Sequence, residues 1–140
     1  MVAFLSLGAV RHGEASRGSA SRSLGALVDG HLSIVVREQD RATVIALDGE
    51  LDIASSPRLE EQIVRVLSSG AELVVLDLED LKFMDATSLR VLLSSHQQAQ
   101  QSAKRLVLVN VGAQVRRLLI LTRLIDVLSV LEGPVELPQS

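Results

Sequence analysis

A carboxylate and two hydroxyls lie close together at Asp85, Thr87 and Ser88, and these residue types in this spacing could do chemistry. Asp85 can cap the start of a helix, which places both hydroxyls in the first helical turn, where backbone N–H groups have no partner inside the helix. We expect a hydroxyl at this position to be exposed and accessible to a kinase. The sequence therefore predicts a phosphorylation site at Thr87 or Ser88.

Phosphorylation there would change the charge of the surface without unfolding the domain. A phosphoryl group carries a charge of about −1.5 to −2, and it would stand beside Asp85 and close to Glu79 and Asp80. The helix dipole would stabilise the phosphate by about 0.3 to 1 kcal/mol, so we expect the domain to stay folded. In a complex, an unpaired like charge at the interface costs several kcal/mol of binding free energy. The local sequence also allows a plain alternative, an ordinary helix cap of small polar residues.

Catalytic and metal-binding motifs are missing from the sequence. It contains no phosphate-binding or dinucleotide-binding glycine loop, no His-Glu-x-x-His, no Gly-x-Ser-x-Gly and no cysteine. The histidines His12, His31 and His96 are far apart in the chain, and we interpret His96 as a packed, hydrogen-bonded residue of a helix. We therefore expect a binding protein with no metal and no cofactor, and not an enzyme.

A second group of carboxylates, Asp48, Glu50 and Asp52, follows an expected strand. They would share one face only if that strand continued past Gly49. We interpret the three carboxylates as a solvated acidic rim of the domain. The alternative is that they belong to a docking surface, and we include Asp52 among the predicted partner-binding residues.

The composition limits the class of protein. The 140 residues suit one domain, and 47% of them are hydrophobic, but no apolar run approaches the roughly 20 residues of a membrane-spanning helix. The apolar start of the chain has no basic residue ahead of it, so we expect a cytoplasmic protein. A net charge of −3 and the absence of Trp and Tyr speak against a nucleic-acid partner.

The hydrophobic periodicity predicts an α/β fold in the order β-β-α-β-α-β-α, with a further short strand at the end as an option. Residues 1–30 are rich in Gly, Ser, Ala and Arg and are expected to form a flexible tail, and residues 31–140 the folded domain. A hairpin (32–36 and 43–47) opens a small mixed sheet, followed by parallel strands (72–78 and 105–111). The helices are expected to start at Ser56-Pro57, near Asp85 and after Gly112, with Gly70 ending the first.

Five short motifs occur in an order and spacing that resemble the STAS family, the domain named for sulphate transporters and anti-sigma factor antagonists. The resemblance covers residues 32–131, and the ordered set is far more specific than any single motif. The motifs are Gly49-Glu-Leu-Asp52, Pro57-Arg-Leu-Glu60, Leu76-Asp-Leu78, Phe83-Met-Asp85, and Leu106-Val-Leu-Val-Asn-Val111 followed by Val115-Arg-Arg-Leu118.

This resemblance implies a STAS-like single domain that regulates transcription as an anti-sigma factor antagonist. Such a domain binds, when unphosphorylated, a cytoplasmic serine kinase of the histidine-kinase-like ATPase fold that is also the anti-sigma factor. Phosphorylation by that kinase breaks the complex, and a metal-dependent protein phosphatase restores it. The composition, and not the resemblance, predicts no nucleic-acid partner and no membrane insertion, and a homodimer stays open.

The switch loop departs from the family pattern, which usually reads Asp-Ser-Ser-Gly-Leu with the second serine as acceptor. Here Thr87 falls on the acceptor, Ala86 replaces the first serine and Ser88 replaces the glycine, while Arg90 puts a cation where a small residue is common. The threonine methyl group and stiffer rotamers suit a serine-specific kinase poorly. The predicted partner-binding residues are Asp52, Asp85, Ala86, Thr87, Ser88 and Arg90.

Two other functions stay open. The altered loop favours a STAS adaptor subunit of a transporter or stress-signalling complex without phosphorylation control. A small nucleotide-binding or hydrolytic domain using Asp77, Asp85 and Thr87 is the third reading.

Overall fold

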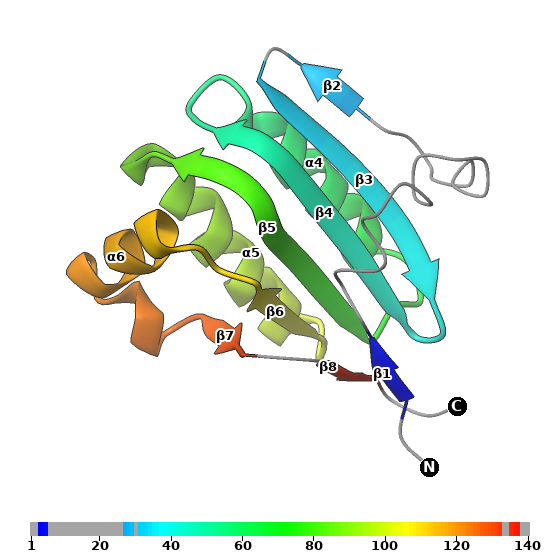
Figure 1. Ribbon diagram of the computed structural model, residues 1–140. Coiled ribbons are helices and arrows are strands. Elements are labelled where there is room, and N and C mark those ends of the chain that lie inside the picture. Colours follow the sequence, from blue (N-terminus) through cyan, green and yellow to red (C-terminus); the bar gives the residue numbers. More distant parts are fainter. Residues whose placement is uncertain (1–2, 6–26, 30, 133–134, 138–140) are drawn as a thin grey trace.

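A six-stranded mixed sheet forms the centre of the computed structural model, which describes residues 3–5, 27–29, 31–132 and 135–137 (Figure 1). The strand order is β2-β3-β4-β5-β6-β7, and a separate two-stranded sheet pairs β1 with β8. The strands are β1 (Ala3–Leu5), β2 (Leu27–Asp29), β3 (Leu32–Gln39), β4 (Ala42–Leu51), β5 (Leu73–Met84), β6 (Arg105–Val109), β7 (Ser129–Leu131) and β8 (Val135–Leu137). The helices are α4 (Ser56–Leu67), α5 (Leu89–Gln101), α6 (Ala113–Leu121) and the short 3₁₀ turns η1 (Ala86–Ser88) and η2 (Leu124–Asp126).

The sheet topology confirms the α/β class, the opening hairpin and the predicted order of the main elements. β3 and β4 pair antiparallel across a turn at Asp40, whose φ of 55° allows the tight reversal. From β4 onward, β5, β6 and β7 pair in parallel. The near-continuous apolar runs of β5 and β6 suit this arrangement, because parallel strands are buried on both faces.

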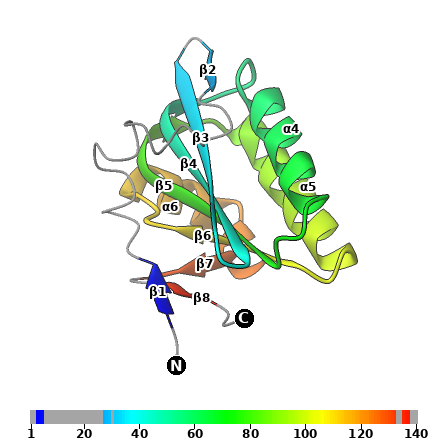
Figure 2. The same cartoon turned by 90° about the vertical axis from the view of Figure 1, so that its right-hand side faces the viewer.

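The helices α4, α5 and α6 contribute to one hydrophobic cluster on the same face of the sheet. α4 and α5 lie side by side there (Figure 1, Figure 2). Spacings of three and four residues put one face of each helix against the strands. The buried helix residues of this cluster include Leu59 and Ile63 of α4, Leu89 and Leu92 of α5, and Val115 and Leu119 of α6.

The two central strands are longer than predicted. β4 runs through Gly49 to Leu51, and β5 runs to Met84, although the sequence pattern ended it at Leu78. The register shifts twice, between Ala46 and Asp48 and between Gly49 and Glu50, so β5 carries extra residues relative to β4. Such bulges break the alternation of buried and exposed side chains by which a strand is read from sequence.

Gly49 is required at its position beside the hairpin. Its φ is 115°, and a Cβ there would lie 1.8 Å from the carbonyl oxygen of His31. A side chain would therefore collide with the backbone, and the left-handed φ also favours glycine.

The ends of α4 differ in detail from the prediction. Pro57 lies in the first turn as expected, but the residue before the helix is Ser55, whose side chain makes no capping bond. The helix ends at Leu67, where the Ser68 hydroxyl donates to the carbonyl of Val64. Gly70 lies beyond this end without a positive φ, so its predicted role in ending the helix was wrong.

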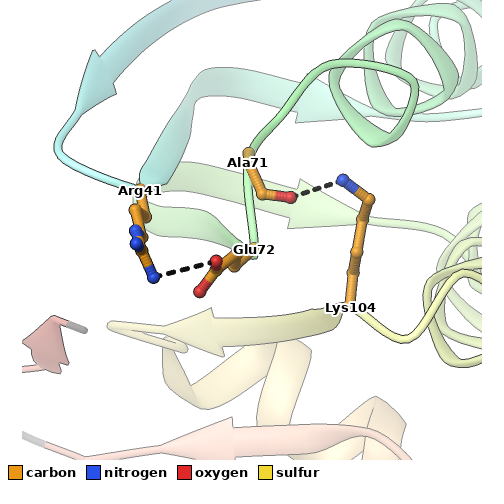
Figure 3. A network of polar contacts seen from close by, with 4 residues as sticks. All are labelled: Arg41, Ala71, Glu72 and Lys104. Carbon is orange, nitrogen blue, oxygen red and sulfur yellow. Dashed lines mark hydrogen bonds and ion pairs between the residues drawn. The ribbon is translucent and has the colours of Figure 1, made fainter. Parts of the chain in front are cut away.

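A polar network ties together the sheet end at which β5 begins (Figure 3). The guanidinium of Arg41 in the β3–β4 turn bonds to the carboxylate of Glu72 at 3.1 Å. Lys104, just before β6, donates to the carbonyl oxygens of Ala71 at 2.6 Å and Ser69 at 2.9 Å. These contacts hold the connections at the sheet end opposite Asp85.

Most of the expected flexible tail, residues 1–30, lies outside the described residues. The exceptions are β1 and β2, two short strands that the sequence analysis did not predict. β7 supplies the optional last strand.

Candidate functional site

Asp85 joins the ends of β4 and β5 to the turn that precedes α5. Its Oδ1 accepts hydrogen bonds from the backbone N–H of Ser88 at 3.0 Å and from the Ser88 hydroxyl at 2.9 Å. Its Oδ2 accepts from the backbone N–H of Ile53 at 3.2 Å, and its own N–H donates to the carbonyl of Leu51 at 3.1 Å. The predicted capping role of Asp85 is confirmed, and one carboxylate fixes two loops.

Ser88 is buried, which contradicts the expectation that both hydroxyls are exposed. Its exposed fraction is 0%, and its hydroxyl lies 3.1 Å from the Leu51 carbonyl and 2.9 Å from Asp85 Oδ1. The residues at 86–88 form the 3₁₀ turn η1, which rotates Ser88 toward the sheet. A kinase could not reach this oxygen without opening the turn, so Ser88 is a structural residue of the loop.

Thr87 lies on the surface, as predicted, together with Ala86 and Arg90. Within the described part of the chain, the Thr87 side chain makes no hydrogen bond or ion pair. Of the two adjacent hydroxyls, the one at Thr87 is therefore the one that an external enzyme can reach.

Asp52 belongs to a turn that lies beside this loop. Its Oδ1 accepts from the N–H groups of Ala54 and Ser55, both at 3.0 Å, and from the Ser55 hydroxyl at 3.1 Å. The hydrogen bond from the Ser55 backbone, aided by the other two bonds, lowers the pKa of the Asp52 carboxyl. The Ile53–Asp85 hydrogen bond connects this turn to the switch loop, so the structure brings Asp52 and Asp85 into one region.

The acidic rim is solvated at Asp48 and Glu50, which are exposed as expected. Lys82 Nζ lies 3.9 Å from Asp48 Oδ1, and both side chains are more than half exposed. Such a contact contributes little, about 0 to 1 kcal/mol.

Three residues near the loop were not identified from sequence. Ile53, whose backbone N–H is bonded to Asp85, is 68% exposed, and Phe83, two residues before Asp85 in the sequence, is 43% exposed. The Gln114 side chain accepts from the N–H of Met84 and donates to its carbonyl, both at 3.1 Å, and so attaches α6 to the last residue of β5. Had the strand been predicted to continue past Leu78, the alternation of its side chains would have identified Phe83 as exposed. No signal in the sequence identifies Gln114 as the residue that bonds to Met84.

An open groove of about 370 Å³ is lined by one residue of α4 and five residues of α5. Arg90 lines this groove and follows Thr87 by three residues in the sequence. The lining residues are Glu60, Arg90, Val91, Leu93, Ser94 and Gln97.

The hydrolytic reading of Asp77, Asp85 and Thr87 is not supported by their arrangement. Asp77 is 1% exposed in the middle of β5, and its Oδ1 accepts from the Asn110 side chain at 3.0 Å. At about 3.3 Å per strand residue, the eight residue steps from Asp77 to Asp85 span up to about 26 Å. The described residues contain no group of acidic or histidine side chains that could hold a metal ion, and no helix among them is long and apolar enough to span a membrane.

Comparison with known proteins agrees with this geometry. Residues 33–136 match the STAS domain. The anti-sigma-B factor antagonists of Staphylococcus aureus and Staphylococcus epidermidis are each 30% identical over 103 residues, which cover 74% of this chain and 95% of the relative.

Solved structures show the same fold. An anti-sigma factor antagonist from Mycobacterium paratuberculosis matches with a TM-score of 0.66 and 24% identity over 74% of this chain and 89% of that one. The phosphorylated form of the Bacillus cell fate determinant SpoIIAA matches with a TM-score of 0.59 and 22% identity over 71% and 90% of the two chains. With the family match spanning most of the sequence, this chain belongs to the STAS domain family.

Proposed function

We propose that this protein is an anti-sigma factor antagonist whose docking to an anti-sigma factor kinase is ended by phosphorylation of Thr87. The observation that carries the proposal is the exposed Thr87 hydroxyl beside a loop fixed by Asp85. The Staphylococcus relatives are anti-sigma-B factor antagonists. SpoIIAA, which shares the fold, has been solved in both unphosphorylated and phosphorylated forms.

The fold is suited to carry a phosphate at Thr87 without unfolding. The Thr87 side chain stands outside the hydrogen bonds of Asp85 and Ser88, so its modification breaks none of them. The phosphoryl group would lie near the N-terminus of α5, where the helix dipole stabilises a negative charge by about 0.3 to 1 kcal/mol. Arg90, exposed in the first turn of α5, is within reach of a phosphate three residues earlier.

A docked partner would be affected far more strongly. The exposed apolar side chain of Ile53, whose backbone is bonded to Asp85, is suited to act as a contact anchor, with Thr87 and Arg90 supplying polar contacts. A charge of about −1.5 to −2 placed in that contact would cost several kcal/mol. Docking would therefore end while the domain stays folded.

The proposed partner is a serine kinase of the histidine-kinase-like ATPase fold, acting in the cytoplasm as the anti-sigma factor. A metal-dependent protein phosphatase would remove the phosphate and restore docking. In this cycle the protein is a regulatory binding partner that other enzymes modify.

Incubation with the anti-sigma factor kinase and ATP, followed by mass spectrometry, tests the proposal. We expect one phosphate, located on Thr87, and none on a Thr87→Ala variant. Ser88 should stay unmodified in both proteins because it is buried. Phosphate on Ser88, or no phosphate on a protein that does bind the kinase, would overturn the switch.

A second candidate is an adaptor of a transporter or stress-signalling complex without phosphorylation control. It is favoured by the switch loop, in which Ala86 and the buried Ser88 replace a serine and a glycine of the usual family pattern. Co-purification of the protein with a transporter ATPase and not with a kinase would decide for this function.

A further inference from the structure

Arg90 carries a positive charge close to Thr87 in the sequence, and none of the described residues neutralises it. Its side chain makes no hydrogen bond or ion pair within the described part of the chain. Asp85 is the acidic residue nearest to it in the sequence, but the Asp85 oxygens bond to Ser88 and to the backbone of Ile53. The guanidinium of Arg90 is therefore available to a new anion.

Thr87 and Arg90 lie on the same side of one helical turn. The 3₁₀ turn η1 ends at Ser88 and α5 begins at Leu89, and the backbone of both residues is right-handed helical. Residues three apart are neighbours on such a turn, with about 5 to 6 Å between their Cβ atoms. The burial agrees, because Ser88 and Leu89 are buried whereas Thr87 and Arg90 are exposed. The Arg90 side chain can thus reach a group attached to the Thr87 oxygen.

Glu60 is the other charged residue that lines the groove of Arg90, and it would compete for the guanidinium. The two side chains line the same groove but form no ion pair. A phosphate attracts an arginine more strongly than one carboxylate does, because it carries a charge of about −1.5 to −2 and three acceptor oxygens. A phosphate on Thr87 would therefore take Arg90 in preference to Glu60.

We propose that Arg90 is the intramolecular counterion of a phosphate on Thr87. This inference rests on the proposed phosphorylation of Thr87 and adds a second residue to the switch. In the unphosphorylated protein the guanidinium is available to a docking partner, and in the phosphorylated protein it is engaged within the chain. Phosphorylation then changes the docking surface twice, by adding a negative charge and by occupying a positive one.

The test places phosphothreonine at residue 87 of the full chain by genetic-code expansion, so that it needs neither the kinase nor docking. A ³¹P NMR titration measures the second pKa of the phosphate, which is about 6 in the absence of special neighbours. Arg90→Gln removes the cation, and Arg90→Lys keeps the charge. Arg65→Gln is the matched control, because it removes an exposed cation from the last turn of α4.

Several carboxylates surround the position of the phosphate, and they remain the same in every one of these proteins. They are Asp85 of the switch loop, Asp52 of the turn bonded to it, and Glu60 of the groove. Each of them raises the pKa of the phosphate, since a like charge disfavours the dianion. A difference between parent and variant therefore reports the removed cation.

We expect the second pKa of the phosphate to be at least about 0.3 pH units higher in Arg90→Gln than in the parent phosphoprotein, because a neighbouring cation favours the dianion. Arg90→Lys should lie closer to the parent than to Arg90→Gln. Arg65→Gln should stay within about 0.1 pH units of the parent, since its charge is exposed and screened by salt.

Equal pKa values in the parent and in Arg90→Gln would overturn the pairing. An equal rise in Arg65→Gln would also overturn it, because the effect would then come from net charge, and so would a value in Arg90→Lys as high as in Arg90→Gln. These results are independent of the proposed function, which fails separately if the kinase leaves Thr87 unmodified while the encoded phosphothreonine still shows the Arg90-dependent pKa.

Discussion

Asp85 Oδ1 accepts hydrogen bonds from both the backbone N–H and the hydroxyl of Ser88, at 3.0 and 2.9 Å. The neighbouring residue Thr87 takes no part in this arrangement and is exposed. Two adjacent hydroxyls thus have opposite roles: Ser88 stabilises the loop, and Thr87 is free for modification.

Replacing Ser88 by alanine should destabilise the protein. Ser88→Ala removes the hydroxyl that lies between Asp85 Oδ1 and the Leu51 carbonyl, while each of these acceptors keeps a backbone N–H donor, so the expected cost is about 0.5 to 1.5 kcal/mol. Thr87→Ala, the matched control one residue away, should stay within about 0.5 kcal/mol of the parent protein. Urea unfolding measures both, and equal losses at the two positions would contradict the assignment of roles.

Acid should remove a contribution that Asp52 makes to stability. Hydrogen bonds, above all from the Ser55 backbone, lower the pKa of Asp52 in the folded protein. The contribution is fully present above the unfolded pKa of about 3.9 and is lost as the pH falls through the lower folded value. The free energy of unfolding, measured by urea titration from pH 6 downward, should therefore converge with that of Asp52→Asn. If the difference in unfolding free energy between the parent protein and Asp52→Asn does not depend on pH, the ionised Asp52 carboxylate is not the source of this stability.

Ile53 should contribute to partner binding and not to folding. Its side chain is 68% exposed beside the switch loop, so Ile53→Ser removes an apolar contact that only a partner would make. We expect the affinity for the anti-sigma factor to fall by about tenfold, which corresponds to about 1.4 kcal/mol. Leu121→Ser is the control, since Leu121 is 73% exposed at the far end of α6. Binding by calorimetry that weakens equally in both variants would remove Ile53 from the docking surface.

Gln114 should fix the end of β5 immediately before Asp85. Gln114→Ala removes both hydrogen bonds to the Met84 backbone and should raise the amide exchange rate of Met84, measured by NMR, by about tenfold or more. Gln100→Ala, an exposed change in α5, is the comparison. If exchange at Met84 is unchanged in Gln114→Ala, the α6 contact does not hold the strand.

The sequence predicted the parts of this protein that depend on local pattern. Alternating and continuous apolar runs indicated the hairpin, the parallel strands and the buried faces of the helices, and Asp85 was recognised as a cap. The end of β5 was missed because two register shifts disturb the alternation that marks a strand. The burial of Ser88 was missed because it depends on the carbonyl of Leu51, 37 residues away in the chain.

The contact between Gln114 and Met84 also could not be predicted from local sequence, because it forms only when α6 packs against the end of β5. It joins residues 30 apart in the sequence, and a glutamine near a helix start has many other common uses. By contrast, the exposure of Thr87 followed from its place after the cap, although only the structure separated it from Ser88.

The most direct measurement compares Thr87→Glu with Thr87→Gln in calorimetric titrations of the anti-sigma factor kinase. The two side chains have nearly the same shape, so their difference isolates negative charge at the proposed acceptor. We predict that Thr87→Gln binds within a few-fold of the parent protein and that Thr87→Glu loses at least about tenfold in affinity, with both variants as stable as the parent. Equal affinities for the glutamate and glutamine variants would contradict a charge switch at Thr87.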